Sequence, residues 1–183
     1  MQPAALATGT DSGGVWPKSP IIIMQERSQE RKTGRCPSGR WAMTMVRALV
    51  VDDSKVMRAL VMHALNRIPG GEFEFVEAAD GRSALQMVEL RRVDIILTDC
   101  NMPRLTGLGL IRAVRSAGYW NNIALVMVSC EYTLERIEQA IQAGADAYIC
   151  KPFTIEEVER RIGPLLQNIL RNKRSTFLAR WFG

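Results

Sequence analysis

Between residues 46 and 170, short apolar runs alternate five times with longer amphipathic segments. The apolar runs are rich in Val, Ile and Leu, which is typical of strands buried on both faces. The segments between them carry apolar residues at helical spacing, and several end at glycine. Strands that alternate with helices in this way predict an α/β fold, a doubly wound, five-stranded parallel sheet covered on both faces.

The boundaries of the expected elements follow from these runs. Strands are expected at residues 47–51, 73–78, 94–98, 123–129 and 147–150. Helices are expected at residues 52–68, 80–92, 107–118, 133–144 and 154–170. The apolar stripe of the first helix is expected at Val56, Leu60, Ala64 and Ile68. The last helix is expected to be capped by Thr154 and to bend at Gly163–Pro164, because proline removes a helical donor.

The two ends of the chain differ in composition from the domain expected between them, at residues 45–170. Residues 1–44 are rich in Gly, Pro, Ser, Thr and Arg, so we interpret them as a disordered leader or the product of a start codon assigned too far upstream. Residues 171–183 form a basic tail with two i,i+4 apolar pairs, Phe177 with Trp181 and Leu178 with Phe182. We expect this tail to dock on a partner or an anionic membrane, or else to fray or fold back on the domain.

Charge and cysteine content argue against several classes of protein. Residues 45–170 hold fourteen Lys or Arg against sixteen Asp or Glu, so the domain lacks the basic surface of a nucleic-acid binder. The tail is basic but too short for a DNA-binding domain, and we expect none. Four cysteines without a CxxC motif indicate neither a zinc site nor disulfides, and no apolar run is long enough for a membrane span. We therefore expect a cytoplasmic protein with reduced thiols.

Polar side chains end or follow four of the five expected strands. Asp52 and Asp53 follow the first expected strand, and Asp99 follows the third. Ser129 is the last residue of the fourth strand, and Lys151 follows the fifth. In doubly wound sheets the working site lies outside the carboxyl ends of the strands, so these groups should meet at one edge. Crowded carboxylates suit Mg²⁺, and an ammonium with a hydroxyl suits the oxygens of a phosphoryl group. The spacing indicates a magnesium-assisted phosphoryl site with an aspartate as acceptor.

Four segments carry a resemblance to a known family: "LVVDDSKVMR", "LTDCNMPRLTG", "MVSCE" and "AYICKPF". Together they resemble the receiver domain of the response regulators of two-component signalling, and in particular its stand-alone, chemotaxis-type members. The resemblance covers roughly residues 46–170, with the segments in the expected order. It implies a flavodoxin-like (βα)5 receiver fold and a protein whose partner-binding face changes on phosphorylation.

The resemblance also implies a role for each residue at the strand ends. Asp99 would accept the phosphoryl group from a histidine kinase, and Lys151 would pair with Asp99 and then with the phosphoryl oxygens. Mg²⁺ would be bound by Asp53, Asp99 and the backbone carbonyl of Asn101, with Asp52 acting through a water molecule. The bond between Lys151 and Pro152 is expected to be cis.

Signalling and reset would depend on further residues. Ser129 would hydrogen-bond the phosphoryl group and, by moving, let Tyr148 swing inward. That movement would change the face formed by the fourth helix, fifth strand and fifth helix, where a downstream protein or a histidine phosphotransfer protein would bind. Asn101 and Glu131, each two residues past a site residue, resemble the fast-resetting chemotaxis pattern. Thr106 stands where many relatives have aspartate, a departure at a loop-shaping position that leaves the chemistry intact.

Several alternatives remain open at the level of sequence. The chain is expected to be no enzyme beyond its own phosphorylation and dephosphorylation, and His63, the lone histidine, lacks partners that would make it an internal phosphodonor. It could instead be a phosphorelay shuttle, or a phosphatase with Asp99 as nucleophile, although Asn101 replaces the second acid that such chemistry needs. Cys100, Cys130 and Cys150 neighbour site residues, and we expect them to fill strand ends, with a redox-sensing cluster as the alternative.

Overall fold

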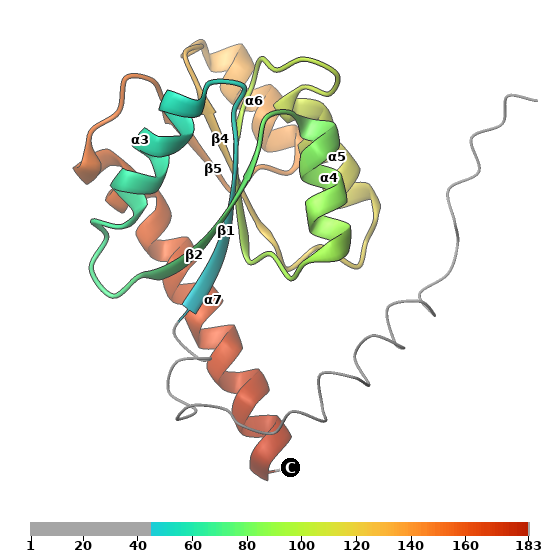
Figure 1. Ribbon diagram of the computed structural model, residues 1–183, viewed down its shortest axis with the longest axis vertical. Helices are drawn as coiled ribbons and strands as arrows, with labels where there is room; N and C mark the ends of the chain where they lie inside the picture. The colour runs from blue at the N-terminus through green and yellow to red at the C-terminus, as the bar shows by residue number, and fades with distance from the viewer. Residues whose placement is uncertain (1–44, 183) are drawn as a thin grey trace, which may run out of the picture. The chain divides into compact units, whose positions relative to one another are not determined.

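The computed structural model describes residues 45–182 and contains five strands and five helices in strict alternation (Figure 1). The strands are β1 (Met45–Val51), β2 (Glu72–Ala78), β3 (Ile95–Asp99), β4 (Ala124–Ser129) and β5 (Ala147–Cys150). The helices are α3 (Lys55–Leu65), α4 (Gly81–Leu90), α5 (Gly107–Ser116), α6 (Leu134–Ala143) and α7 (Ile155–Phe182). The expected leader, residues 1–44, lies outside the described residues.

All five strands are parallel and form one sheet in the order β2-β1-β3-β4-β5. The chain therefore reverses its direction of winding after β2, which places the topological switch point between β1 and β3. Helices α4, α5 and α6 cover one face of the sheet, and α3 and α7 cover the other (Figure 1). The predicted α/β fold, with a doubly wound parallel sheet of flavodoxin-like topology, is confirmed.

Two apolar clusters, one on each face of the sheet, form the core. The first packs Leu49, Ile96 and Leu125 of the strands against α4, α5 and α6. The second packs Val50 and Leu97 against α3 and α7. Both clusters use alternate residues of the same central strands, which explains why these strands are apolar along their whole length rather than at every second position.

The expected apolar stripe of α3 is partly wrong. Val56 is 69% exposed and Leu60 is 48% exposed, whereas Val61, Ala64 and Leu65 form the buried face. Residues at a constant spacing of four drift around a helix with 3.6 residues per turn, so the predicted stripe leaves the buried face toward the start of the helix. Two apolar side chains of α3 are therefore left on the surface.

Helix α7 differs most from its predicted boundaries. Thr154 caps it as expected, because its hydroxyl accepts a hydrogen bond of 3.2 Å from the Glu157 amide. The helix continues through Pro164 and past Leu170 to Phe182, so a frayed tail after residue 170 is wrong. The missing amide of Pro164 removes one helical hydrogen bond without ending the helix. None of the described helices is both long and apolar enough to cross a membrane.

Candidate functional site

Lys151 joins two of the predicted carboxylates at the carboxyl edge of the sheet. Its Nζ donates a hydrogen bond of 2.7 Å to Asp52 Oδ2 and another of 2.5 Å to Asp99 Oδ1. The three side chains are 9%, 6% and 13% exposed, respectively. The ends of β1, β3 and β5 thus bring together one ammonium and two carboxylates, as the sequence predicts.

The two carboxylates keep Lys151 charged. Burial on its own would lower the pKa of the Lys151 ammonium, and it is the largest single influence. The hydrogen bonds to Asp52 and Asp99, together with their negative charges, outweigh burial and raise that pKa above its usual value. The site therefore presents a fixed positive charge next to the Asp99 carboxylate.

The loop between β3 and α5 holds Asp99 rigidly. Asp99 Oδ2 accepts a hydrogen bond of 2.7 Å from the Asn101 amide, and the Gly107 amide donates one of 3.0 Å to the Cys100 carbonyl. A Cβ atom on Gly107 would lie 1.9 Å from the Asp99 carbonyl oxygen, so only glycine allows α5 to start this close to the strand. Thr106 caps α5 by accepting a hydrogen bond from the Gly109 amide, which agrees with the loop-shaping role expected of this position.

A second contact holds this loop, and sequence reasoning missed it. Arg104, in the left-handed backbone region with φ of 65°, forms an ion pair with the fully buried carboxylate of Asp80. Asp80 also caps α4 through the amides of Arg82 and Ser83. The Asp-Gly pair before the second helix was the available signal for the cap, but nothing local links residue 80 to residue 104. The contact joins the β3–α5 loop to the start of α4.

Glu131 is linked to the predicted acceptor through Asn101, whose backbone amide bonds Asp99 and whose side chain bonds Glu131. Its carboxylate accepts a hydrogen bond of 2.9 Å from Asn101 Nδ2 and forms an ion pair of 2.5 Å with Arg136 Nε. The hydrogen bond from Asn101 is the main cause that lowers the pKa of Glu131, and Arg136 adds to it. The two residues predicted to tune reset are therefore in direct contact, and Arg136, which the sequence analysis did not identify, holds the pair from α6.

Ser129 and Tyr148, the predicted switch residues, are both buried, at 1% and 7% exposure. The Ser129 hydroxyl accepts a hydrogen bond of 3.1 Å from the Glu131 amide, and the Tyr148 hydroxyl donates one of 2.5 Å to the Glu131 carbonyl. Burial raises the pKa of Tyr148, opposed by a hydrogen bond to Ser129. Tyr148 is therefore already buried in this structure, and its hydroxyl links it to the segment between β4 and α6.

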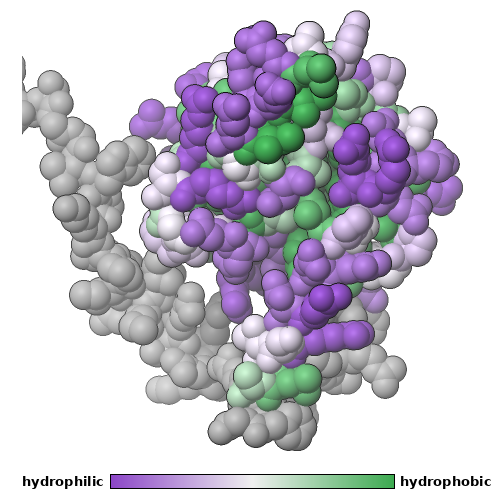
Figure 2. All heavy atoms as spheres, turned by 180° about the vertical axis from the view of Figure 1, so that it is seen from behind, coloured by the Kyte–Doolittle hydropathy of each residue, from purple (hydrophilic) through white to green (hydrophobic). Residues whose placement is uncertain are grey.

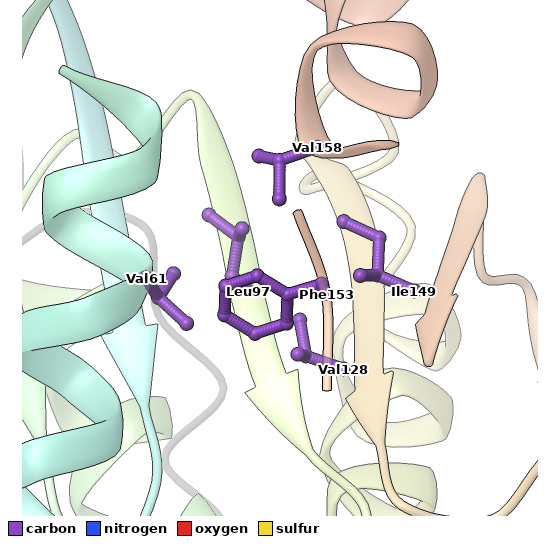
Figure 3. A pocket seen from close by; sticks show the side chains of 6 residues that line it. All are labelled: Val61, Leu97, Val128, Ile149, Phe153 and Val158. Atoms are coloured by element: carbon purple, nitrogen blue, oxygen red, sulfur yellow. The ribbon is translucent and has the colours of Figure 1, made fainter. Parts of the chain in front are cut away.

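Phe153 anchors the segment that carries Lys151. Its ring points into a space lined by Val61, Leu97, Val128, Ile149 and Val158, from α3, three strands and α7 (Figure 3). The space has no room for a water molecule, so the ring is held by apolar contact on several sides. The Lys151–Pro152 peptide bond next to it is cis, as expected.

An apolar groove of about 370 Å³ opens beside Lys151. It is lined by residues of α3, of the segments that follow β4 and β5 and of the start of α7, namely Met57, Leu60, His63, Ala64, Cys130, Lys151, Pro152, Phe153 and Ile155. Leu60, which was predicted to be buried but is exposed, is one of the lining residues. His63 is exposed at the same groove, and it is a lining residue rather than a member of the charged cluster.

The oxygen donors at this edge fit Mg²⁺ better than a softer metal. Lys151 bridges the carboxylates of Asp52 and Asp99. Asp53 is exposed and follows Asp52 in the chain, and Asn101 comes two residues after Asp99. Within residues 45–182, no three acidic, histidine or cysteine side chains converge closely enough to enclose an ion alone. Mg²⁺ suits such a site because it keeps several waters and needs few protein ligands.

Two of the three cysteines near the site pack at strand ends as expected, whereas Cys130 is exposed, so the expectation is wrong for that residue. Cys100 and Cys150 pack against the cluster below α4, α5 and α6, and Cys100, Cys130 and Cys150 are free thiols. Burial raises the pKa of the Cys100 thiol, and the nearby Glu131 and Asp99 carboxylates raise it further. A raised pKa leaves less of the reactive thiolate, which argues against a sensor role for Cys100.

Comparison with known proteins decides the family. Residues 48–163 match the family model of the response regulator receiver domain. The chain belongs to this family. The chemotaxis protein CheY of Pseudomonas aeruginosa is 34% identical to this receiver domain over 124 residues, which cover 68% of this chain and 98% of that protein. Chemotaxis protein CheY-3 of Vibrio cholerae is 32% identical, with 68% of this chain and 94% of that protein covered.

Solved structures agree with the sequence relatives. The chemotaxis response regulator CheY4 of Vibrio cholerae superimposes with a TM-score of 0.57 at 35% identity, covering 69% of this chain and 99% of that one. The receiver domain of the Francisella response regulator 1452 gives a TM-score of 0.60 at 27% identity, covering 67% and 98%. The chain is therefore a receiver domain of the CheY type, a class consistent with phosphorylation-dependent signalling.

Proposed function

We propose that this receiver domain is a phosphorylation switch in which Asp99 accepts a phosphoryl group from a histidine kinase. The contact between Lys151 and Asp99 carries the proposal, because it places a permanent cation beside a partly exposed carboxylate at the switch point of the sheet. In the transfer, the bond between the donor histidine nitrogen and phosphorus breaks as a bond from an Asp99 oxygen to phosphorus forms. The protein would turn over only its own acyl phosphate and would act as a signalling module rather than an enzyme.

Mg²⁺ would be held by Asp53, Asp99 and the Asn101 carbonyl, with Asp52 acting through water. When bound, the ion would supply positive charge that offsets the phosphoryl oxygens. The protein's own contribution is a rigid loop that fixes Asp99 and an ammonium that stays charged at neutral pH. Both features lower the reorganisation needed when negative charge builds up on the transferred group.

The hydroxyl of Ser129 would bond to a phosphoryl oxygen on Asp99. The Ser129 hydroxyl already accepts a hydrogen bond from the Glu131 amide, and the Glu131 carbonyl accepts one from the Tyr148 hydroxyl. A shift of Ser129 would therefore be passed through the β4–α6 segment to Tyr148 and to the face formed by α6, β5 and α7. A downstream protein or a histidine phosphotransfer protein would bind that face.

The groove beside Lys151 would receive the phosphodonor. It lies at the same edge as Asp99, and the half-buried Met57 and the exposed Leu60 line one wall. A helix that bears the phosphohistidine could bury its apolar face there and bring the histidine to Asp99. The Leu60→Ser variant should then weaken transfer from a histidine kinase but leave transfer from a small phosphodonor such as acetyl phosphate unchanged.

The decisive experiment is phosphotransfer profiling of the full chain against the histidine kinases of its host, with radiolabelled phosphate and Mg²⁺. We expect label on the wild-type chain, none on Asp99→Ala, and loss of labelling when the metal is chelated. The label should be lost at alkaline pH, as an acyl phosphate is. Absence of label from every kinase and from acetyl phosphate would contradict the proposal, and so would full labelling of Asp99→Ala.

A further inference from the structure

The last part of α7 leaves the domain as a projecting helix. Its buried positions Val158, Ile162, Leu166 and Ile169 belong to the core, but between Arg171 and Ala179 no side chain is buried. Figure 1 shows α7 continuing past the amino end of β1 and away from the sheet. About three turns of helix therefore extend beyond the surface that the sheet can cover.

Lys173 fixes the direction of this projection. Its Nζ donates a hydrogen bond of 2.7 Å to the Met45 carbonyl and one of 2.6 Å to Asp94 Oδ2. The same Asp94 oxygen accepts a hydrogen bond of 2.7 Å from the backbone amide of Arg47 in β1. Lys173 is therefore bonded to a carboxylate that is itself bonded to the sheet. The projection starts from the amino end of the strands, whereas Asp99 lies at their carboxyl end.

The projecting turns combine cations with apolar side chains. Arg171, Arg174 and Leu178 are exposed and follow one another at spacings of three and four residues, which places them on one side of the helix. Leu178 is 53% exposed. Figure 2 shows apolar residues next to the end of the coloured part of this helix, beyond a hydrophilic band. In the sequence, Trp181 and Phe182 come one turn after Phe177 and Leu178.

We propose that the projecting end of α7, residues 171–182, docks on an anionic lipid bilayer. Residues 171–183 hold four Lys or Arg and no acidic residue, so the surface complements anionic headgroups. The apolar tip would enter the interface between headgroups and acyl chains, as a short basic amphipathic helix does. A second copy of this helix would bring a like charge, and a nucleic acid would leave the apolar tip uncovered. Docking from this end leaves Asp99 open to a phosphodonor.

Co-sedimentation of the full chain with lipid vesicles tests the proposal. We expect binding to vesicles of phosphatidylcholine with phosphatidylglycerol, weak binding to phosphatidylcholine alone, and a loss of affinity as salt rises. Arg174→Gln should lower the affinity roughly fivefold, as expected for one cation at an anionic surface. Leu178→Ser should also lower it, because it removes apolar area from the interface.

Arg161→Gln is the matched control, since Arg161 is an exposed arginine on the part of α7 that lies against the domain. It makes the same change in charge and should leave vesicle binding unchanged. Unfolding midpoints of the three variants should match that of the wild type, which separates docking from folding. Equal losses in Arg161→Gln and Arg174→Gln would show general charge attraction and overturn the proposal.

Two other partners of the projecting helix can be distinguished from a lipid bilayer: a second copy of the chain and a nucleic acid. A concentration-dependent dimer that Leu178→Ser abolishes, without vesicle binding, would show that the helix pairs with a second copy and would overturn the proposal. A salt-dependent gel shift with DNA or RNA, without vesicle binding, would also overturn it. The vesicle assay needs no phosphorylation, so its failure would leave the role of Asp99 unaffected, and loss of that role would leave vesicle binding intact.

Discussion

Asn101 and Glu131 lie thirty residues apart in the sequence, and the Asn101 side-chain amide donates a hydrogen bond of 2.9 Å to the Glu131 carboxylate beside Asp99. The position of each residue in the sequence predicts that it tunes reset. The structure joins them into one polar pair and adds Arg136, whose guanidinium holds Glu131 from the first turn of α6. The residues proposed to tune reset are therefore linked through one carboxylate to α6, which is part of the proposed partner-binding face.

Arg136→Ala should slow the hydrolysis of the acyl phosphate. If the Asn101–Glu131 pair orients the attacking water, freeing Glu131 from Arg136 loosens that pair and lengthens the phosphoryl lifetime by roughly three- to tenfold. The measurement is decay of radiolabelled phosphoprotein after the donor is removed. Arg112→Ala, which removes an exposed arginine of α5, serves as the control. An unchanged lifetime in Arg136→Ala would exclude this role for the arginine.

The wild-type phosphoprotein itself should be short-lived, because Asn101 and Glu131 place polar groups next to the acyl phosphate. The same decay experiment measures this lifetime without a variant. A half-life of many hours in the purified phosphoprotein would contradict the prediction.

Asp80 should make the stability of the domain depend on pH. Burial on its own raises the pKa of this carboxyl and is the largest influence, but the hydrogen bonds from Ser83, the charge of Arg104 and the Arg82 amide together lower it below 3.8. A carboxyl whose pKa is lower in the folded state stabilises the fold at pH values above 3.8, and that stabilisation disappears as the pH falls through the folded-state value.

Asp80→Asn keeps an oxygen for the cap of α4 but removes the charge that pairs with Arg104. We expect a loss of about 2 kcal/mol in the free energy of unfolding at neutral pH, and a smaller difference from wild type in strong acid. Urea unfolding across an acid pH series measures both. Arg104→Ala should cost less, because the Arg104 side chain is 63% exposed. A difference that stays constant with pH would show that Asp80 acts only as a cap.

Gly107→Ala should destabilise the domain by about 2–4 kcal/mol, because the new Cβ would meet the Asp99 carbonyl oxygen at 1.9 Å. The loop must then move and carry Asp99 with it, so phosphorylation should fall as well. Gly163→Ala is a sharp contrast, since a Cβ there meets no atom within 4 Å and the position is helical. That variant should gain up to about 1 kcal/mol. Equal stabilities for the two variants in urea would refute the steric argument.

Lys173→Met should show that α7 is anchored beyond residue 170. The change keeps most of the apolar stem but loses the hydrogen bonds to the Met45 carbonyl and to Asp94, so we expect a loss of about 1–2 kcal/mol in unfolding free energy. Arg171→Met, at an exposed neighbouring position, should be nearly neutral. If both variants unfold at the wild-type denaturant concentration, the anchor contributes nothing to stability.

The helices and strands of this protein, and the residues that end its strands, can be predicted from local sequence pattern. Strands buried on both faces must be apolar throughout, and helices must be amphipathic, so both can be recognised from local pattern. The same alternation predicts parallel strands, and parallel strands bring their carboxyl ends to one edge. Asp52, Asp99 and Lys151 could therefore be assigned to one site before any contact was known.

Which of these groups are in contact, and which residues hold them, depends on the three-dimensional packing of the chain. Lys151 bridges Asp52 and Asp99 across 99 and 52 residues, and Lys173 reaches Asp94 across 79. No local pattern marks Arg104 as the partner of Asp80 or Arg136 as the partner of Glu131. Such pairs depend on strand order, on loop direction and on the side of a helix that faces inward. These are set by the packing of the whole chain.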